Sequence, residues 1–382
     1  MNGRACKARG RLHYNPLVTA AVQIAGGGVA GLSCALLLAR GGRPVEVYER
    51  QGAVGGRFAG GWQVLENGSS PEDALAELVA AGFPAGIPAH PAHRATFLDG
   101  RGGVFEVTSA APFAYFVRRG AGAGTLDGWL AERLEETGGR LLRHRPAPAS
   151  VQVVATGPRQ ADGVAREVVF TSSLPDTVAV LFDPAVTPTG YAYLFCLGGW
   201  GTFGVAQVRR TATLREAAEV AWERFRKVFG AFPFEVVHVG GQYMNFSIPA
   251  HLRDAAGQWH VGEAAGVQDF LFGLGNRLAM RSAALVAGGV AGHFDERRFR
   301  RRILAPMAAS VGLRFLYERQ GQRAFSALCR YAAGRDFREL LVRLQRPRRA
   351  VLGMAAVVRW AWQERRGCRH GSLCRWCRRR ER

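Results

Sequence analysis

The sequence predicts an α/β fold with a discontinuous parallel sheet, an inserted antiparallel-sheet domain and a helical C-terminal segment. Over residues 22–48 an apolar strand, a glycine-rich turn, a small apolar helix and a second strand follow one another, which is the order of a parallel βαβ unit. Short alternating strands with turn residues between them recur from residue 95 to residue 243, as in an antiparallel sheet. From residue 303 onward apolar residues repeat every four positions, which is helical spacing.

The glycine-rich turn, Gly26 to Gly31, predicts a dinucleotide site. Gly26 allows a tight turn, Gly28 lets the backbone approach a pyrophosphate, and Gly31 lets the helix pack closely on the strand. The helix N-terminus offers free N–H groups to the phosphates. Glu49 ends the second strand, where an acid accepts hydrogen bonds from a ribose hydroxyl. A plain tight turn is the alternative, but the strand, helix and acid in register favour the nucleotide.

Three later segments predict that the dinucleotide is FAD and form a Rossmann-type FAD-binding domain. The loop 55–57 follows the second strand, and the strand 151–158 ends in small residues suited to the adenine half. The segment 260–266 places Glu263 and a glycine after a strand, before a helix that begins near Asn276. There an acid would lie near the ribityl chain, and the helix N-terminus would face the electron-rich end of the flavin.

The chain resembles the geranylgeranyl reductase family, within the FAD-dependent aromatic hydroxylase-like superfamily. The resemblance covers roughly residues 20–292 and rests on the glycine loop, Gly55–Phe58, Trp62–Asn67, Arg118-Arg119, Gly124–Asp127, Pro188–Phe195, Gly201–Val205 and Gly262-Glu263. Together, the motifs and the resemblance predict FAD contacts from Gly26, Gly28, Val29, Ala30, Gly31, Glu49, Arg50, Gly56, Arg57, Arg119, Ala155, Thr156, Gly157, Gly262, Glu263, Gly273, Gly275 and Asn276.

The resemblance implies a flavin that delivers hydride to double bonds of an isoprenoid or lipid substrate, after reduction by an external electron donor. Candidate catalytic residues are Tyr191 and Tyr193, with Tyr191 or water as the proton donor. A monooxygenase acting on an apolar or aromatic small molecule is the alternative, and a non-enzymatic flavin-binding scaffold is a third. Where the hydroxylases carry Asp-Gly near their nicotinamide contact, this chain has Thr156-Gly157, which favours the reductase. Glu263 stands where the family usually has aspartate.

The expected domain bounds follow from these motifs. Residues 1–18 are expected to be a basic leader, because they lack the apolar run of a secretory signal. The FAD-binding domain is assigned to 19–160 and 255–295, with a hairpin insert at about 71–107. The substrate domain is assigned to 161–254, where the aromatic residues Phe182, Tyr191, Tyr193, Phe195, Trp200 and Phe203 are expected beside the substrate or in the core. A basic helical segment with a Cys/His tail occupies 296–382.

The positive charge of the chain is concentrated in that last segment. The whole chain carries +21, and residues 296–382 hold 24 arginines against 6 acids, a net of +18. Basic amphipathic helices cover a domain with a solvated basic face or rest on an anionic membrane surface, and both readings stay open. Nucleic acid is disfavoured because no binding module accompanies the charge. We expect a cytoplasmic protein, peripheral at a membrane if these helices dock there.

The end of the chain carries four residues with metal-ligand chemistry: Cys368, His370, Cys374 and Cys377. Thiolates and an imidazole within ten residues could close a tetrahedral zinc site. Neighbouring arginines would favour thiol deprotonation. A reversible disulfide, or no role, is the alternative.

Overall fold

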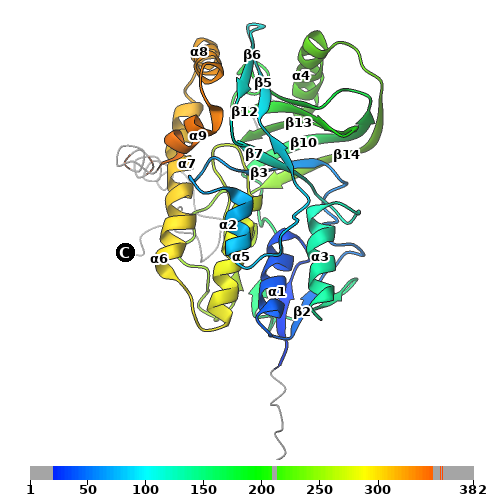
Figure 1. The fold of residues 1–382 in the computed structure, drawn as a ribbon, viewed down its shortest axis with the longest axis vertical. Helices are drawn as coiled ribbons and strands as arrows, with labels where there is room; N and C mark the ends of the chain where they lie inside the picture. The colour runs from blue at the N-terminus through cyan, green and yellow to red at the C-terminus, as the bar shows by residue number, and fades with distance from the viewer. Residues whose placement is uncertain (1–19, 209–212, 347–352, 354, 356–382) are drawn as a thin grey trace, which may run out of the picture.

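A five-stranded parallel sheet forms the nucleotide-binding half, in the strand order β15-β9-β1-β2-β8. The computed structural model describes residues 20–208, 213–346, 353 and 355. The strands of this sheet are β1 (Val22–Ala25), β2 (Val45–Tyr48), β8 (Arg140–Leu142), β9 (Val153–Val154) and β15 (Trp259–His260). Beside it α1 (Val29–Arg40) packs against α3 (Leu126–Glu136) and α5 (Asn276–Val290), as Figure 1 shows. The expected βαβ unit and its discontinuous sheet are confirmed.

Local sequence explains the first unit. The β-branched side chains Val22, Ile24, Val45 and Val47 are buried in the sheet, where they suit a pleated, covered surface. Helix α1 is almost wholly apolar because it is covered on most sides. It ends at Gly41 and Gly42, the second of which has φ +78°, a conformation that glycine adopts without steric cost.

Two further sheets build the other half of the molecule. A three-stranded sheet has the order β3-β7-β4, and a seven-stranded sheet has the order β14-β10-β13-β12-β11-β5-β6. The three-stranded sheet comprises β3 (Trp62–Glu66), β4 (His90–Ala92) and β7 (Ala114–Arg118). The larger sheet comprises β5 (Arg94–Asp99), β6 (Val104–Thr108), β10 (Gly163–Ser172), β11 (Thr177–Phe182), β12 (Gly190–Leu197), β13 (Trp200–Val208) and β14 (Phe234–Met244).

The hairpin expected around Gly100-Arg101-Gly102 is present as β5 and β6, which pair antiparallel. Strand β5 also pairs in parallel with β11, so this hairpin extends the seven-stranded sheet. Between the hairpin and β3 lies α2 (Ala74–Ala80), whose N-cap Asp73 accepts hydrogen bonds from two backbone N–H groups.

The two faces of the seven-stranded sheet have different coverings. Ala192, Leu194 and Cys196 of β12 belong to a core under α4 (Leu214–Phe229), which also contains Phe203. Because side chains alternate along a strand, Tyr193 and Phe195 belong to the opposite face, which packs toward the C-terminal helices. Phe203 therefore lies in the α4 core rather than beside a substrate.

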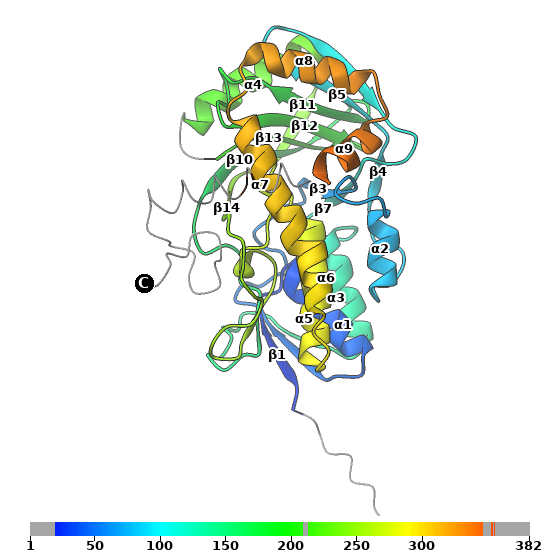
Figure 2. The ribbon, with the colours of Figure 1, turned by 90° about the vertical axis from the view of Figure 1, so that its left-hand side faces the viewer.

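The C-terminal segment is helical, as expected. It comprises α6 (Glu296–Phe299), a π-helical turn η2 (Arg300–Leu304), α7 (Ala305–Tyr317), α8 (Gln322–Ala333) and α9 (Phe337–Gln345). In Figure 2 the α6–α7 stack runs from the nucleotide-binding half to the large sheet, and α8 lies across that sheet. Ile303, Met307 and Val311 are buried in the core of the nucleotide-binding half, so this segment covers the domain.

Within the described ranges, no helix has both the length and the apolar character needed to span a membrane. The leader 1–18 and the four tail residues Cys368, His370, Cys374 and Cys377 lie outside the described residues. Among those that are described, no three His, Cys, Asp or Glu side chains gather as metal ligands would. Three described cysteines, Cys34, Cys196 and Cys329, are buried free thiols, and burial raises the pKa of each.

Candidate active site

One continuous cavity of about 1520 Å³ joins the glycine loop to the large sheet and the C-terminal helices. Single ligand pockets occupy roughly 300–1,000 Å³, so this space suits two molecules end to end. Its two parts are named here by their linings. The nucleotide end is lined by the glycine loop and the segments that follow β2, β9 and β15, and the substrate end by the seven-stranded sheet and α7–α9.

The glycine loop has the geometry that a dinucleotide requires. Gly26 has φ +108°, and a Cβ there would lie 2.4 Å from the Ala155 carbonyl oxygen. A Cβ on Gly31 would lie 2.0 Å from the Gly26 carbonyl oxygen, so helix and strand approach too closely for any side chain. Gly28 differs, because no atom lies within 4 Å of its Cβ position. Its open face borders the cavity, and no side chain caps the start of α1.

Glu49 lies across the loop from these glycines. Its carboxylate accepts hydrogen bonds from the Gly27 N–H (2.8 Å) and the Gln51 N–H (2.8 Å). The Gly55 N–H donates to the Gly27 carbonyl oxygen at 3.0 Å, which holds the second glycine segment against the first. The acid and both glycine segments therefore border one end of the cavity.

Arg57 connects the two halves of the protein beside the cavity. Its guanidinium pairs with Glu263 at 3.1 Å and donates to the Gln242 side chain (3.0 Å) and the Tyr243 carbonyl oxygen (2.7 Å) of β14. Burial raises the pKa of Glu263, and the charge of Arg57 opposes that rise. Glu263 lies in the 3₁₀ turn η1 (Gly262–Ala265), so the loop after β2, strand β14 and η1 meet here.

Arg119 fixes the start of α5. Its guanidinium makes a bidentate pair with the fully buried Asp127, at 2.7 and 3.0 Å, which is a strong and directional arrangement. Its third donor reaches the Asn276 side-chain oxygen at 2.8 Å. The Asn276 amide in turn donates to the Val64 carbonyl oxygen. The N-terminus of α5, which lines the cavity, is thus held by the Arg119 side chain and by a backbone carbonyl of β3.

The structure gathers nearly all the sequence-predicted site residues around this cavity. Those that line it are Gly26, Gly28, Val29, Ala30, Glu49, Arg50, Gly56, Arg57, Arg119, Ala155, Thr156, Gly157, Glu263, Gly273, Gly275, Asn276, Tyr191 and Tyr193. Two predicted contacts, Gly31 and Gly262, do not line it. They serve packing instead, since a Cβ on Gly262 would lie 2.8 Å from the Ala30 Cβ.

The substrate end is apolar and aromatic. From the sheet it is lined by Phe97, Val178, Val180, Phe182, Tyr191, Tyr193 and Phe195. From α7–α9 it is lined by Leu313, Leu316, Tyr317, Gln320, Ala324, Phe325, Ala327, Leu328, Cys329, Tyr331, Ala332, Phe337, Leu340, Leu341, Leu344 and Gln345. Glu167 of β10 also lines the cavity, and apart from it none of the described side chains that the seven-stranded sheet and α7–α9 contribute is charged. Trp200, expected beside the substrate or in the core, is absent from the lining: its ring contacts the Arg118 guanidinium and its N–H donates to the Gly60 carbonyl oxygen.

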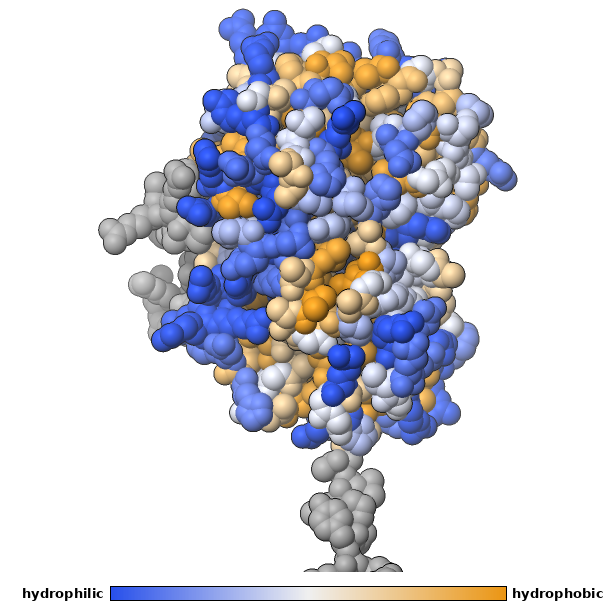
Figure 3. Space-filling model, viewed as in Figure 1, coloured by the Kyte–Doolittle hydropathy of each residue, from blue (hydrophilic) through white to orange (hydrophobic). Residues whose placement is uncertain are grey.

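Four lining residues of α7–α9 are also exposed, which locates the mouth of the cavity. They are Leu316, Leu328, Tyr331 and Leu344, with 40–49% of their surface accessible. Exposed arginines lie on the same helices, among them Arg323 and Arg330. On the face seen in Figure 3, hydrophobic residues gather in separate patches among hydrophilic ones.

The hydroxyl groups of the two candidate catalytic tyrosines are both engaged in hydrogen bonds. Tyr191 donates to the Phe272 carbonyl oxygen at 2.7 Å, and Tyr193 lies 3.2 Å from a carboxylate oxygen of Glu167. Burial raises the pKa of both hydroxyls, so each stays a neutral hydrogen-bond donor. Sequence analysis missed Glu167. Its only local signal is its place between Ala165 and Val169 on the buried face of β10.

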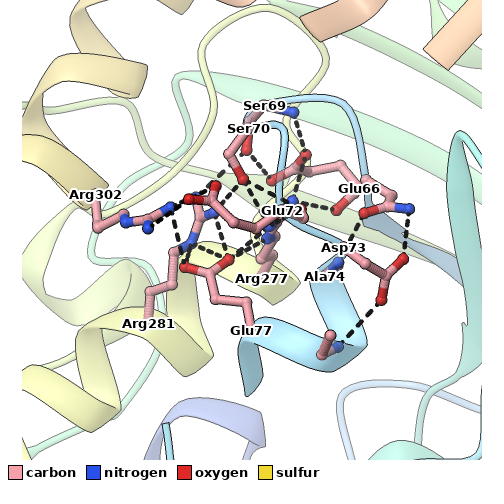
Figure 4. A network of polar contacts seen from close by, with 12 residues as sticks. Glu66, Ser69, Ser70, Glu72, Asp73, Ala74, Glu77, Arg277, Arg281 and Arg302 are labelled. Carbon is pink, nitrogen blue, oxygen red and sulfur yellow. Dashed lines mark hydrogen bonds and ion pairs between the residues drawn. The ribbon is translucent and has the colours of Figure 1, made fainter. Parts of the chain in front are cut away.

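A buried ion network also escaped sequence analysis (Figure 4). Arg277 is fully buried, and with Arg281 it binds the Glu77 carboxylate at 2.5–3.1 Å. Arg302 makes a bidentate contact with Glu72. The network ties α5 to α2 and to the loop before it, and so supports the first turn of α5, where Asn276 lies. Its partners lie about 200 residues apart, which is why no local pattern revealed them.

Comparison with known proteins supports this fold assignment. A family model described as an NAD(P)-binding Rossmann-like domain matches residues 24–86. A geranylgeranyl bacteriochlorophyll reductase-like protein from Thermoplasma acidophilum has a similar structure: TM-score 0.65, 14% identity, with 88% of this chain and 95% of that chain covered. For p-nitrophenol 4-monooxygenase from Pseudomonas putida the TM-score is 0.61, with 16% identity and coverage of 86% and 98%. For a myxobacterial chondrochloren halogenase, described as FAD-dependent, the values are 0.55, 18%, 92% and 98%.

No curated protein sequence matches the chain. At these identities the likeness shows the fold alone, which this chain shares with the reductase-like protein, the monooxygenase and the FAD-dependent halogenase. The nucleotide end fits such a cofactor, because Gly28 leaves open the space a pyrophosphate would occupy and Glu49 lies opposite. The specific reaction depends on the substrate end.

Proposed function

We propose that this protein is an FAD-dependent oxidoreductase that reduces carbon–carbon double bonds of an isoprenoid or lipid substrate. The observation that carries the proposal is the continuous cavity, whose substrate end has a sheet wall of aromatic and aliphatic residues with one carboxyl group, Glu167, and a helical wall of described residues without any charged side chain. Such a lining gains free energy from burying hydrocarbon, and its helical wall offers nothing to pair with a charged ligand. A long apolar chain fits it better than a small polar ring.

The residues of the nucleotide end would hold FAD, and the bound flavin would supply hydride. Gly28, Val29 and Ala30 would receive the pyrophosphate at the N-terminus of α1, and Glu49 would accept hydrogen bonds from the ribose. Arg57 and Glu263 would border the ribityl chain. The N-terminus of α5 at Asn276 would face the flavin ring, oriented by Arg119.

The flavin needs an electron donor from outside the chain. Thr156-Gly157, in place of the Asp-Gly of the hydroxylases, supports a donor other than a nicotinamide nucleotide bound at that turn. Gly157 keeps the turn open, with φ +80° and Arg57 as the one neighbour within 4 Å of its Cβ position. The mouth at Leu316, Leu328, Tyr331 and Leu344 supports delivery of an apolar substrate from a lipid surface.

The test is incubation of the FAD-loaded protein with dithionite and a geranylgeranyl glycerolipid under anaerobic conditions, followed by mass spectrometry. Gains of two hydrogen masses per reduced double bond are expected. A matched reaction with NADPH and oxygen checks the alternative. A gain of one oxygen atom there, with no hydrogenated product anaerobically, would identify a monooxygenase and overturn the proposal.

A further inference from the structure

Glu167 is a carboxylate in an otherwise uncharged part of the cavity. Among the described residues of the seven-stranded sheet and α7–α9 that line the cavity, it is the one charged side chain. It is 3% exposed, and an isolated buried carboxylate is costly unless its environment has a use for it. Neither core packing nor the expected flavin contacts account for it.

The sheet is shaped to bring Glu167 and Tyr193 together. Glu167 on β10 and Tyr193 on β12 are separated by β13, where Gly204 lies opposite both of them in register. A Cβ on Gly204 would lie 2.2 Å from the Tyr193 ring, so only glycine lets that ring cross β13. The tyrosine hydroxyl then reaches Glu167 Oε2 at 3.2 Å.

Residues of and beside β3 contact the Glu167 carboxyl group as well. Gln63 on β3 donates to Oε2 at 3.0 Å, and a Cβ on Gly61 would lie 2.5 Å from Oε1. Both hydrogen bonds therefore reach Oε2, and within the described chain Oε1 has no hydrogen-bond partner. Because β3 belongs to the same small sheet as the segment leading to Arg119, this carboxyl group lies where the nucleotide end meets the substrate end.

The surroundings keep the group ready to exchange a proton near neutral pH. Burial raises the pKa of Glu167 to about 7, while the Tyr193 hydroxyl, the charge of Arg119 and the Gln63 amide limit the rise. A general acid is most effective when its pKa lies near the working pH. Tyr193, whose pKa is raised further above neutrality, acts as a hydrogen-bond donor to the carboxylate.

We propose that Glu167 is the catalytic acid of the site and gives its proton to the substrate, with Tyr193 as its positioning residue. This rests on the proposed function. Hydride, with its two electrons from the reduced flavin, forms a C–H bond at one carbon of the double bond. The proton of Glu167 forms the C–H bond at the other carbon, and the broken O–H bond leaves its electron pair on the carboxylate. Tyr193 and Gln63 stabilise that anion until solvent reprotonates it.

The experiment compares the FAD-loaded wild type with Glu167→Gln, Tyr193→Phe and the control Glu106→Gln, which removes an exposed carboxylate on β6. Infrared spectra recorded from pH 5 to pH 9 follow the carbonyl band of protonated carboxyl groups. A band that titrates near pH 7 should be present in the wild type and the control and absent from Glu167→Gln. In Tyr193→Phe its midpoint should move to higher pH, because a donor to the carboxylate is lost.

The same proteins are assayed for dithionite-driven reduction of the geranylgeranyl lipid. Glu167→Gln should lose a factor of roughly 10²–10⁴ in rate, with unchanged FAD content, and the control should match the wild type. A Glu167→Gln rate within threefold of the wild type, or a wild-type spectrum with no band attributable to Glu167, would overturn the proposal. If the wild type reduces no lipid, the proposed reductase function is overturned, and with it the proton transfer from Glu167 to the substrate, whatever the infrared result.

Discussion

Removing the charge of Glu77 should strongly destabilise the protein. Its carboxylate accepts hydrogen bonds from Arg277 and Arg281, whose side chains are 0% and 5% exposed. Burial raises the pKa of Glu77, but the hydrogen bonds and charges of the two arginines outweigh this, so the pKa is lowered overall and the group stays charged. Glu77→Gln keeps the shape of the side chain but removes its negative charge, so the two buried guanidinium groups lose their main ion-pair partner.

Breaking a buried ion pair from one side costs about 3–5 kcal/mol. With a urea slope of about 3 kcal/mol per M, the unfolding midpoint should fall by about 1–1.7 M. Tryptophan fluorescence during urea unfolding of the FAD-loaded protein measures this shift. FAD should also dissociate more readily, because Arg277 directly follows Asn276 at the cavity wall.

Glu339→Gln is the matched control. Its carboxylate pairs with Arg343 on the surface, with side chains 68% and 70% exposed, and such a pair contributes only about 0–1 kcal/mol. The control should therefore unfold with the wild type. If Glu77→Gln also unfolds within 1 kcal/mol of the wild type, as the control should, the network does not hold α5 in place.

Four further outcomes are expected. Gly28→Leu should fold but lose FAD, since the Gly28 backbone has φ −96° and no atom lies within 4 Å of its Cβ position, where the cofactor would bind. The control Gly321→Leu, at another glycine with open space around it, should keep FAD. A purified Gly28→Leu protein that is yellow with bound FAD would contradict the prediction. The pKa of Glu167 is raised from 4.5 to about 7, so its contribution to the free energy of unfolding is fully present below pH 4.5 and should decline by about 3 kcal/mol as pH rises through 7. The free energy of unfolding of Glu167→Gln should lack this pH dependence, and wild-type and variant curves that run parallel with pH would refute it. NADPH or NADH alone should reduce the flavin slowly, and rapid anaerobic bleaching would favour the monooxygenase. The protein should sediment with anionic vesicles at low salt, with roughly 1 kcal/mol from each of Arg323 and Arg330; salt-independent binding to neutral vesicles would leave the basic helices as a solvated face.

The sequence alone determined the nucleotide-binding half. Its requirements are local: a tight turn at Gly26, an open approach at Gly28, close packing at Gly31 and an acid at the end of the next strand are imposed over a few residues, so they leave a readable spacing. The hairpin around Gly100–Gly102 and the four-residue repeat Ile303, Met307, Val311 are local for the same reason, since turn chemistry and helical periodicity act over short distances.

Tertiary structure decided the substrate end and the supports behind it. Strand periodicity places half of the aromatic residues on each face but does not say which face meets the cofactor, so the sequence left Phe203 open between the substrate and the core, and only the structure places it under α4. Glu167 gains its significance from Tyr193 and Gln63, which arrive from other strands. Glu77 and Arg281 meet across 204 residues, and their attraction depends on burial that only the folded chain provides. Charge, aromaticity and strand alternation can be read from the sequence, whereas the partner of a side chain and the polarity of its surroundings are set only by the folded structure.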